Sequence, residues 1–117
     1  MANDALLNPI KIGRYELPNR VFMAPMTRSR ANNPENVATP LIAEYYSQRA
    51  SAGLLITEGS QVSKQGVGYI NTPGIHSQAQ VEGWKQVTQA VRDKNGQGGM
   101  RILFILQVQR LYGLSML

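Results

Sequence analysis

Short apolar segments separated by polar loops make up the first part of the chain. Residues 10–17, IKIGRYEL, alternate between apolar and polar positions around Gly13, which predicts a short β-hairpin. Residues 20–24, RVFMA, form an apolar segment of strand length, and Pro25, which has no amide proton, ends regular strand pairing. Residues 26–38 are polar and contain Asn-Asn-Pro, so we expect a loop there.

A first helix is predicted to begin at Thr39. The threonine hydroxyl can cap the first turn, and Pro40 suits the first helical position. The apolar side chains that follow form one stripe along the helix, made of Leu41, Ile42, Tyr45 and Tyr46. Gly53 is the predicted end of this helix, and residues 54–57, LLIT, predict a short buried strand.

A second helix is predicted after residue 76. Residues 77–80, SQAQ, fit a capping box, in which the first and last side chains satisfy each other's backbone amides. The apolar residues behind it recur at helical spacing and predict a core-facing side, namely Val81, Trp84, Val87 and Val91. Asn-Gly and Gly-Gly pairs within residues 95–99 close this helix, and residues 101–106, RILFIL, predict a third buried strand.

The predicted order is hairpin, strand, helix, strand, helix, strand. This order favours the α/β class, with βαβ units and a parallel sheet. Because three parallel strands cannot cover both faces of such a sheet, we expect part of a larger architecture. The prediction is the N-terminal portion of a (β/α)₈ TIM barrel, an incomplete barrel preceded by a short β-hairpin; a full barrel needs about 250 residues. A small three-layer α/β domain is the structural alternative.

Composition excludes several kinds of site. The 117 residues include no cysteine and a single histidine, His76, so disulfides, thiolate metal sites, a cysteine nucleophile and a histidine-rich metal site are excluded, and no metal site is predicted. The net charge of +5 is spread along the chain, which is typical of a solvated surface rather than of a nucleic-acid interface. The N-terminus lacks the features of a secretory signal, and residues 102–117, the most apolar segment, are shorter than a bilayer span. We therefore expect a soluble, cytoplasmic protein that does not enter a membrane.

Three blocks carry a family signature. Residues 17–31 read LPNRVFMAPMTRSRA, residues 54–63 read LLITEGSQVS, and residues 68–91 read GYINTPGIHSQAQVEGWKQVTQAV. In this order they resemble the first strand, the second strand and the following loop and helix of the Old Yellow Enzyme family, including 12-oxophytodienoate and N-ethylmaleimide reductases. The resemblance covers roughly residues 8–95. It implies an FMN enzyme that takes hydride from NAD(P)H and reduces the C=C bond of a small α,β-unsaturated carbonyl compound.

The resemblance also implies which residues bind the cofactor. Pro25, Met26 and Thr27 follow the first strand, where barrel active sites are built, and the backbone of this turn is expected to lie against the flavin. The Thr27 hydroxyl is expected to bond near the flavin C4 carbonyl and so tune the cofactor, the alternative being a polar loop residue. Gly59 is expected to let the ring system approach the backbone, the alternative being an ordinary turn glycine.

Other residues receive weaker roles. Tyr69 is expected near the substrate, with packing on its own loop as the alternative, and Gln107 is carried over as a flavin-binding glutamine although no Trp-His pair follows it. Glu58 is expected to make a structural hydrogen bond and His76 to lie on the surface. Arg28 and Arg30 are candidates for pairing with carboxylates at the barrel mouth. No catalytic residue is assigned, because the family's substrate-binding and proton-donating residues find no counterpart in this sequence.

The last ten residues do not follow the family pattern. We expect residues 1–107 to be the barrel portion and residues 108–117 to be an atypical tail, for which a frameshift or a mis-predicted gene end is a hypothesis that sequencing of the downstream DNA tests. Two functions follow. The chain is either part of an FMN-dependent ene-reductase or a truncated remnant without activity of its own; the sequence leaves the oligomeric state open.

Overall fold

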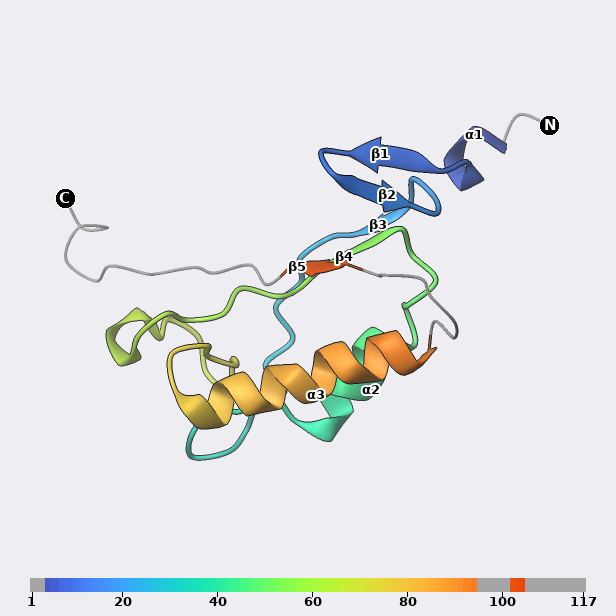
Figure 1. Cartoon of the computed structure of the whole chain (residues 1–117). Helices are drawn as coiled ribbons and strands as arrows, with labels where there is room; N and C mark the ends of the chain where they lie inside the picture. The colour runs from blue at the N-terminus through green and yellow to red at the C-terminus, as the bar shows by residue number, and fades with distance from the viewer. Residues whose placement is uncertain (1–3, 95–101, 105–117) are drawn as a thin grey trace, which may run out of the picture.

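The computed structural model describes residues 4–94 and 102–104. Along the chain they form α1 (Asp4–Leu7), β1 (Ile10–Ile12), β2 (Tyr15–Leu17), β3 (Phe22–Met23), α2 (Pro40–Ser47), β4 (Leu54–Ile56), the 3₁₀ helix η1 (Lys64–Gly66), α3 (Gln78–Lys94) and β5 (Ile102–Phe104) (Figure 1). The short α1 was not predicted from the sequence. No helix in the described part of the chain is long and apolar enough to cross a membrane.

The predicted hairpin is confirmed. Strands β1 and β2 pair antiparallel, from Ile10 opposite Leu17 to Ile12 opposite Tyr15. Gly13 in the connection has a φ of +59°, a left-handed conformation that a residue without a side chain adopts at little cost. In Figure 1 the hairpin lies on one side of the central strands and the two long helices lie on the other.

The central sheet is parallel, with the strand order β3-β4-β5. Phe22 pairs with Leu54 across the first two strands, and Leu54 pairs with Ile102 across the last two. Helices α2 and α3 connect successive strands and lie on the same side of the sheet, which is the arrangement of a barrel wall (Figure 1). The α/β prediction is confirmed, and the three-layer alternative, which places helices on both faces, does not fit.

Strand β3 is shorter than predicted. Only Phe22–Met23 pair with β4, whereas residues 20–24 were expected to form the strand. The amide of Arg20 donates instead to the carbonyl of Leu6 at 2.8 Å, and the amide of Val21 donates to the side chain of Asn19 at 3.0 Å. These local bonds engage the amides of Arg20 and Val21, so the start of the segment bonds toward β4 through the carbonyl of Val21, which accepts from the amide of Gly53 at 2.8 Å.

Helix α2 begins as predicted. The Thr39 hydroxyl accepts a hydrogen bond from the amide of Ile42 at 3.4 Å, and Pro40 occupies the first turn. Ile42 and Tyr46, four residues apart, are buried against the sheet side, but Leu41 is 57% exposed and was wrongly assigned to the same stripe. A position adjacent in sequence lies about 100° around the helix, so Leu41 points away from the core.

Gly53 does not end α2, which was a wrong prediction. The helix ends at Ser47, and Gly53 lies six residues later, immediately before β4. A Cβ atom there would collide with the backbone of Asn19, so the glycine permits a close approach between two chain segments. That approach is held by the Asn19 side-chain amide, which donates to the carbonyl of Ser51 at 2.8 Å.

Helix α3 carries the predicted capping box. The Ser77 hydroxyl accepts from the amide of Gln80 at 3.2 Å, and the Gln80 side-chain oxygen accepts from the amides of Ser77 and His76. Trp84, Val87 and Val91 are buried as predicted, while Val81 is only partly buried. The core between helices and sheet consists of Met23, Ala31, Ala38, Ile42, Tyr46, Ala50, Leu55, Trp84, Val87 and Val91.

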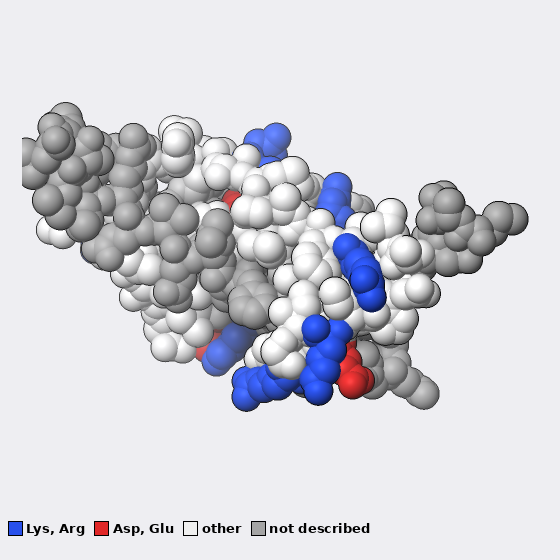
Figure 2. Space-filling view, turned by 90° about the horizontal axis from the view of Figure 1, so that it is seen from above, with Lys and Arg blue, Asp and Glu red and all other residues white. Residues whose placement is uncertain are grey.

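Basic side chains do not form one patch on the hairpin side of the molecule. Figure 2 shows them at several separate places across an otherwise mostly uncharged face, with acidic side chains beside some of them. This distribution agrees with the interpretation of the net positive charge as solvated surface.

Candidate functional site

Two predicted cofactor-binding segments follow neighbouring parallel strands. Pro25–Thr27 begin two residues after the end of β3, and Gly59 lies three residues after the end of β4. Because carboxyl ends of parallel strands meet at one edge of a sheet, the fold brings both segments to the same edge. Pro25, Met26 and Thr27 are all exposed there, and Gly59 is half-buried.

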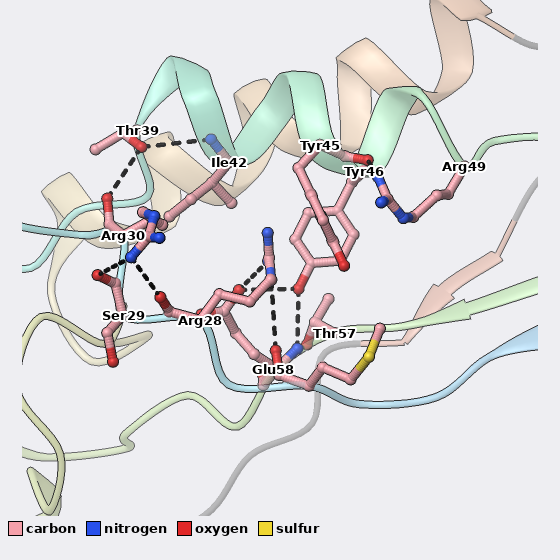
Figure 3. A network of polar contacts seen from close by, with 11 residues as sticks. Arg28, Ser29, Arg30, Thr39, Ile42, Tyr45, Tyr46, Arg49, Thr57 and Glu58 are labelled. Carbon is pink, nitrogen blue, oxygen red and sulfur yellow. Dashed lines mark hydrogen bonds and ion pairs between the residues drawn. The ribbon is translucent and has the colours of Figure 1, made fainter.

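An ion pair links the two segments. The Arg28 guanidinium, through Nη2, binds Oε2 of Glu58, whose side chain is fully buried (Figure 3). Nε of Arg28 also donates to the carbonyl of Met26 at 3.4 Å. The carboxylate pairing predicted for Arg28 and the structural hydrogen bond predicted for Glu58 are confirmed, with each other as partners.

Tyr46 completes the surroundings of the buried carboxylate. Its hydroxyl oxygen accepts from the backbone amide of Glu58 at 2.9 Å and lies 3.1 Å from Oε2 of Glu58, to which the hydroxyl donates (Figure 3). Burial raises the pKa of Tyr46 above its ordinary value, and the amide hydrogen bond from Glu58 opposes that shift. The neutral phenol is therefore the form that this fold accommodates.

The guanidinium of Arg28 also lies against aromatic rings. Its central carbon is 3.5 Å from the ring centre of Tyr45 and 4.8 Å from that of Tyr46. Arg49 approaches the Tyr45 ring as well, at 3.6 Å. Cation–π contacts of this kind add to the ion pair and fix the plane of the Arg28 side chain.

The buried Tyr46 hydroxyl predicts a loss of stability at alkaline pH. Because the folded-state pKa is raised, the stability contributed by the neutral phenol is complete below the unfolded-state pKa, near 10, and is lost as the pH rises above it. Urea unfolding midpoints measured between pH 8 and pH 11 should therefore fall more steeply for the natural chain than for Tyr46→Phe, which cannot ionise. Tyr69→Phe is the control, since that ring is 64% exposed, and parallel profiles for all three proteins would contradict the expectation.

The loop after β4 is buried and polar. Thr57, Glu58, Ser60 and Gln61 are all nearly inaccessible, and the Gln61 side-chain amide donates to the hydroxyl of Thr72. Three buried acceptor atoms have no hydrogen-bond partner within the described residues: Glu58 Oε1, Ser60 Oγ and Gln61 Oε1. Unpaired buried acceptors are costly, so this end of β4 is suited to a bound group or a polypeptide that supplies donors.

The other sequence predictions have mixed outcomes. Tyr69 is exposed on the loop between η1 and α3, and its carbonyl accepts from the Thr72 hydroxyl at 3.1 Å. Arg30 donates to the carbonyls of Arg28 and Ser29 rather than to a carboxylate in the described part of the chain. His76 is partly buried beside Gln80 instead of fully on the surface. Gln107 and the tail 108–117 lie outside the described residues.

A hollow of about 330 Å³ lies between the loop after β3 and the outer side of α2, lined by Arg28, Arg30, Leu41, Ile42, Glu44, Tyr45 and Gln48. Neither Pro25–Thr27 nor Gly59 contributes to it. Among the described residues, the candidate site is an exposed edge at the strand ends. No group of three potential metal ligands occurs among residues 4–94 and 102–104.

The cluster formed by Arg28, Glu58 and Tyr46 has only a weak signal in the sequence. Its signal was a single carboxylate directly after a buried strand, in the segment LLITE, because an acidic residue there needs a partner once the strand is buried. The partner itself is 30 residues away in sequence, so only the fold identifies it.

Comparison with known proteins places these features in a family context. Residues 5–105 match the NADH:flavin oxidoreductase / NADH oxidase family. The chain is 50% identical over 91 residues to the chanoclavine-I aldehyde reductase of Penicillium roqueforti, covering 76% of this chain and 24% of that protein. It is 46% identical over 104 residues to 12-oxophytodienoate reductase 1 of Oryza sativa subsp. japonica, covering 88% and 25%.

Solved structures of the same kind of enzyme superpose on this chain. The old yellow enzyme from Trypanosoma cruzi superposes with a TM-score of 0.83 at 38% identity, covering 93% of this chain and 28% of that one. The chain thus spans about a quarter of the length of the proteins that it matches.

Proposed function

Because this chain belongs to the NADH:flavin oxidoreductase / NADH oxidase family, we propose that it supplies one edge of the flavin site of an FMN-dependent ene-reductase. The observation that carries the proposal is the position of Pro25–Thr27 and Gly59 at the same edge of a parallel sheet, joined through the pair Arg28–Glu58. In barrel enzymes this edge is where substrates and cofactors bind. The described residues superpose on part of an old yellow enzyme, which supports the assignment of that edge.

The residues present fit a flavin in three respects. The turn Pro25–Thr27 is exposed and can lie against a planar ring. Gly59 has no side chain to keep such a ring away from the backbone. The unpaired acceptors Glu58 Oε1, Ser60 Oγ and Gln61 Oε1 show that the neighbouring loop can accept further hydrogen bonds. FMN, when bound, supplies the hydride-carrying chemistry between NAD(P)H and the C=C bond of an α,β-unsaturated carbonyl compound.

Each residue has a defined part in this proposal. The backbone of Pro25 and Met26 supports the ring, and the Thr27 hydroxyl donates a hydrogen bond that stabilises negative charge on it. Tyr69, exposed on its loop, is proposed to contact the small-molecule substrate. The relatives' names specify an aldehyde reductase and an oxo-acid reductase, which supports a carbonyl compound as substrate.

The alternative is a remnant without activity of its own. It is favoured by the exposed edge of the described sheet. Strand β3 lies at an edge of the described sheet, and Val21 just before it and Phe22 within it are 47% and 40% exposed. An edge of this kind needs a covering polypeptide, so flavin binding by the chain alone decides between the two candidates.

Removal of the Thr27 hydroxyl should weaken FMN binding about two- to tenfold, the effect of one hydrogen bond. The measurement is a titration of the 117-residue chain with FMN, followed by quenching of flavin fluorescence, for the natural chain and Thr27→Val. Thr88→Val is the matched control, because the Thr88 hydroxyl donates to the carbonyl of Lys85 within α3, away from the strand ends. If the natural chain is folded but shows no saturable FMN binding, the remnant is supported. If Thr27→Val and Thr88→Val bind FMN with equal affinity, the role of Thr27 is rejected.

A further inference from the structure

We propose that the pair Arg28–Glu58 is a positioning clamp, which sets the separation between the two segments that contact the flavin. The inference rests on the proposed function, and it adds residues that do not themselves contact the cofactor. Its first support is the position of Arg28 and Glu58 in the chain. Arg28 directly follows Thr27, and Glu58 directly precedes Gly59. A bond between Arg28 and Glu58 therefore acts on Thr27 and Gly59 through one peptide unit on each side.

The clamp holds the first segment at more than one point. Besides its bond to Glu58, Arg28 donates from Nε to the carbonyl of Met26, inside the turn that precedes it. Its guanidinium is stacked on Tyr45 at 3.5 Å, so the side chain has little freedom to rotate (Figure 3). The backbone of Met26 and the guanidinium of Arg28 consequently move together.

The second segment is held through Tyr46. The Tyr46 hydroxyl bonds both to the backbone amide and to the carboxylate of Glu58, at 2.9 and 3.1 Å. Tyr46 is fully buried in α2, so the helix anchors the carboxylate from a third element. The clamp thus joins the loop after β3, the loop after β4 and α2 (Figure 3).

Stability alone is a poor explanation for this arrangement. A buried ion pair seldom stabilises a fold more than apolar side chains of the same volume, and its best-attested use is to fix one registry. The backbone next to Arg28 also supports a positioning role. Ser29 has a φ of +56°, a left-handed conformation that is costly for a residue with a side chain. Arg30 holds this turn by donating to the carbonyl of Arg28 at 3.0 Å.

The test uses two conservative variants that keep most of the volume. Glu58→Gln removes the charge and keeps one acceptor oxygen, while Arg28→Lys keeps the charge and loses the planar fork and its stacking on Tyr45. Amide hydrogen exchange of the full chain without FMN should rise at least about tenfold in both segments, residues 24–31 and 57–61, in either variant, with α3 unchanged. Lys85→Met is the matched control, because the pair Lys85–Glu82 is exposed and lies within one helix.

FMN titration supplies a second readout that a purely structural pair would not move. In Glu58→Gln the affinity should fall, and the further effect of Thr27→Val should shrink, since a hydroxyl that is no longer positioned contributes less. Unchanged exchange, a rise in only the mutated segment, or a uniform rise along the chain would overturn the clamp, as would faster exchange without any loss of affinity. If the natural chain does not bind FMN, the proposed function fails, while the exchange data still decide whether the two segments are coupled.

Discussion

Replacing Arg28 by methionine should lower the free energy of unfolding by about 3–5 kcal/mol, because it leaves the buried carboxylate of Glu58 without a cation. Methionine keeps the length and the apolar contact with Tyr45, so the loss reports on the charge. Glu58 is fully buried, and water cannot replace the guanidinium without opening the loop. Urea unfolding followed by the fluorescence of Trp84, the single tryptophan, measures the effect. A domain of this size has about 5–15 kcal/mol in total, so at the lower end of that range part of the variant population would be unfolded without urea.

Two comparisons separate the buried charge from a general effect of mutation. Lys85→Met breaks the exposed pair with Glu82 on α3 and should leave the unfolding midpoint unchanged. The double variant Arg28→Met with Glu58→Leu removes both charges and should recover much of the loss, since no unpaired charge remains. If Arg28→Met is tolerated as well as Lys85→Met, the carboxylate finds another partner and the account of this pair is wrong.

Features that depend on neighbouring residues were predicted well from the sequence. The hairpin around Gly13, the threonine cap of α2 and the capping box of residues 77–80 all follow from contacts within a few residues. The parallel sheet could also be predicted, because the order of strands and helices restricts the topology to few solutions. Contacts between near neighbours and the order of the elements can both be predicted from the sequence without knowledge of the fold.

Predictions that required distant contacts were wrong. Gly53 was assigned to a helix end, since glycine commonly ends helices, but its space is taken by Asn19, more than thirty residues earlier. Leu41 was placed in the core because it is apolar, whereas the side that faces the sheet is set by Ile42 and Tyr46. Apolar character alone does not determine which of two adjacent helix positions is buried.

The candidate site also contains some features that the sequence predicts and others that only the structure reveals. Thr27 and Gly59 came from the resemblance of two blocks, and their roles stay predictions that the FMN titration tests. The bond between Arg28 and Glu58 spans 30 residues and is seen only in the fold. The three unpaired acceptors near β4 had no signature in the sequence, because satisfaction of a polar atom depends on everything packed around it.

Trp84→Ala should be the other substitution of large effect, with a loss of about 3–5 kcal/mol in the free energy of unfolding. Trp84 is 2% exposed at the centre of the core, and its ring centre lies 6.1 Å from that of Tyr46. Removal of the indole leaves a cavity between α3 and α2 that the surrounding side chains cannot fill completely. Circular dichroism is the required measurement, since the variant contains no tryptophan.

The indole also holds the loop that carries Tyr69, and a second variant isolates this role. Nε1 of Trp84 donates to the carbonyl of Gly74 at 3.0 Å, and Gly74 pairs with Gln61 on the buried loop after β4. Trp84→Phe removes this donor but keeps most of the apolar volume, so its cost should be well below that of Trp84→Ala. Hydrogen exchange should then rise in residues 69–75 while the rest of α3 stays protected. Equal losses for both variants would mean that the hydrogen bond, rather than the volume of the ring, determines the stability of this core.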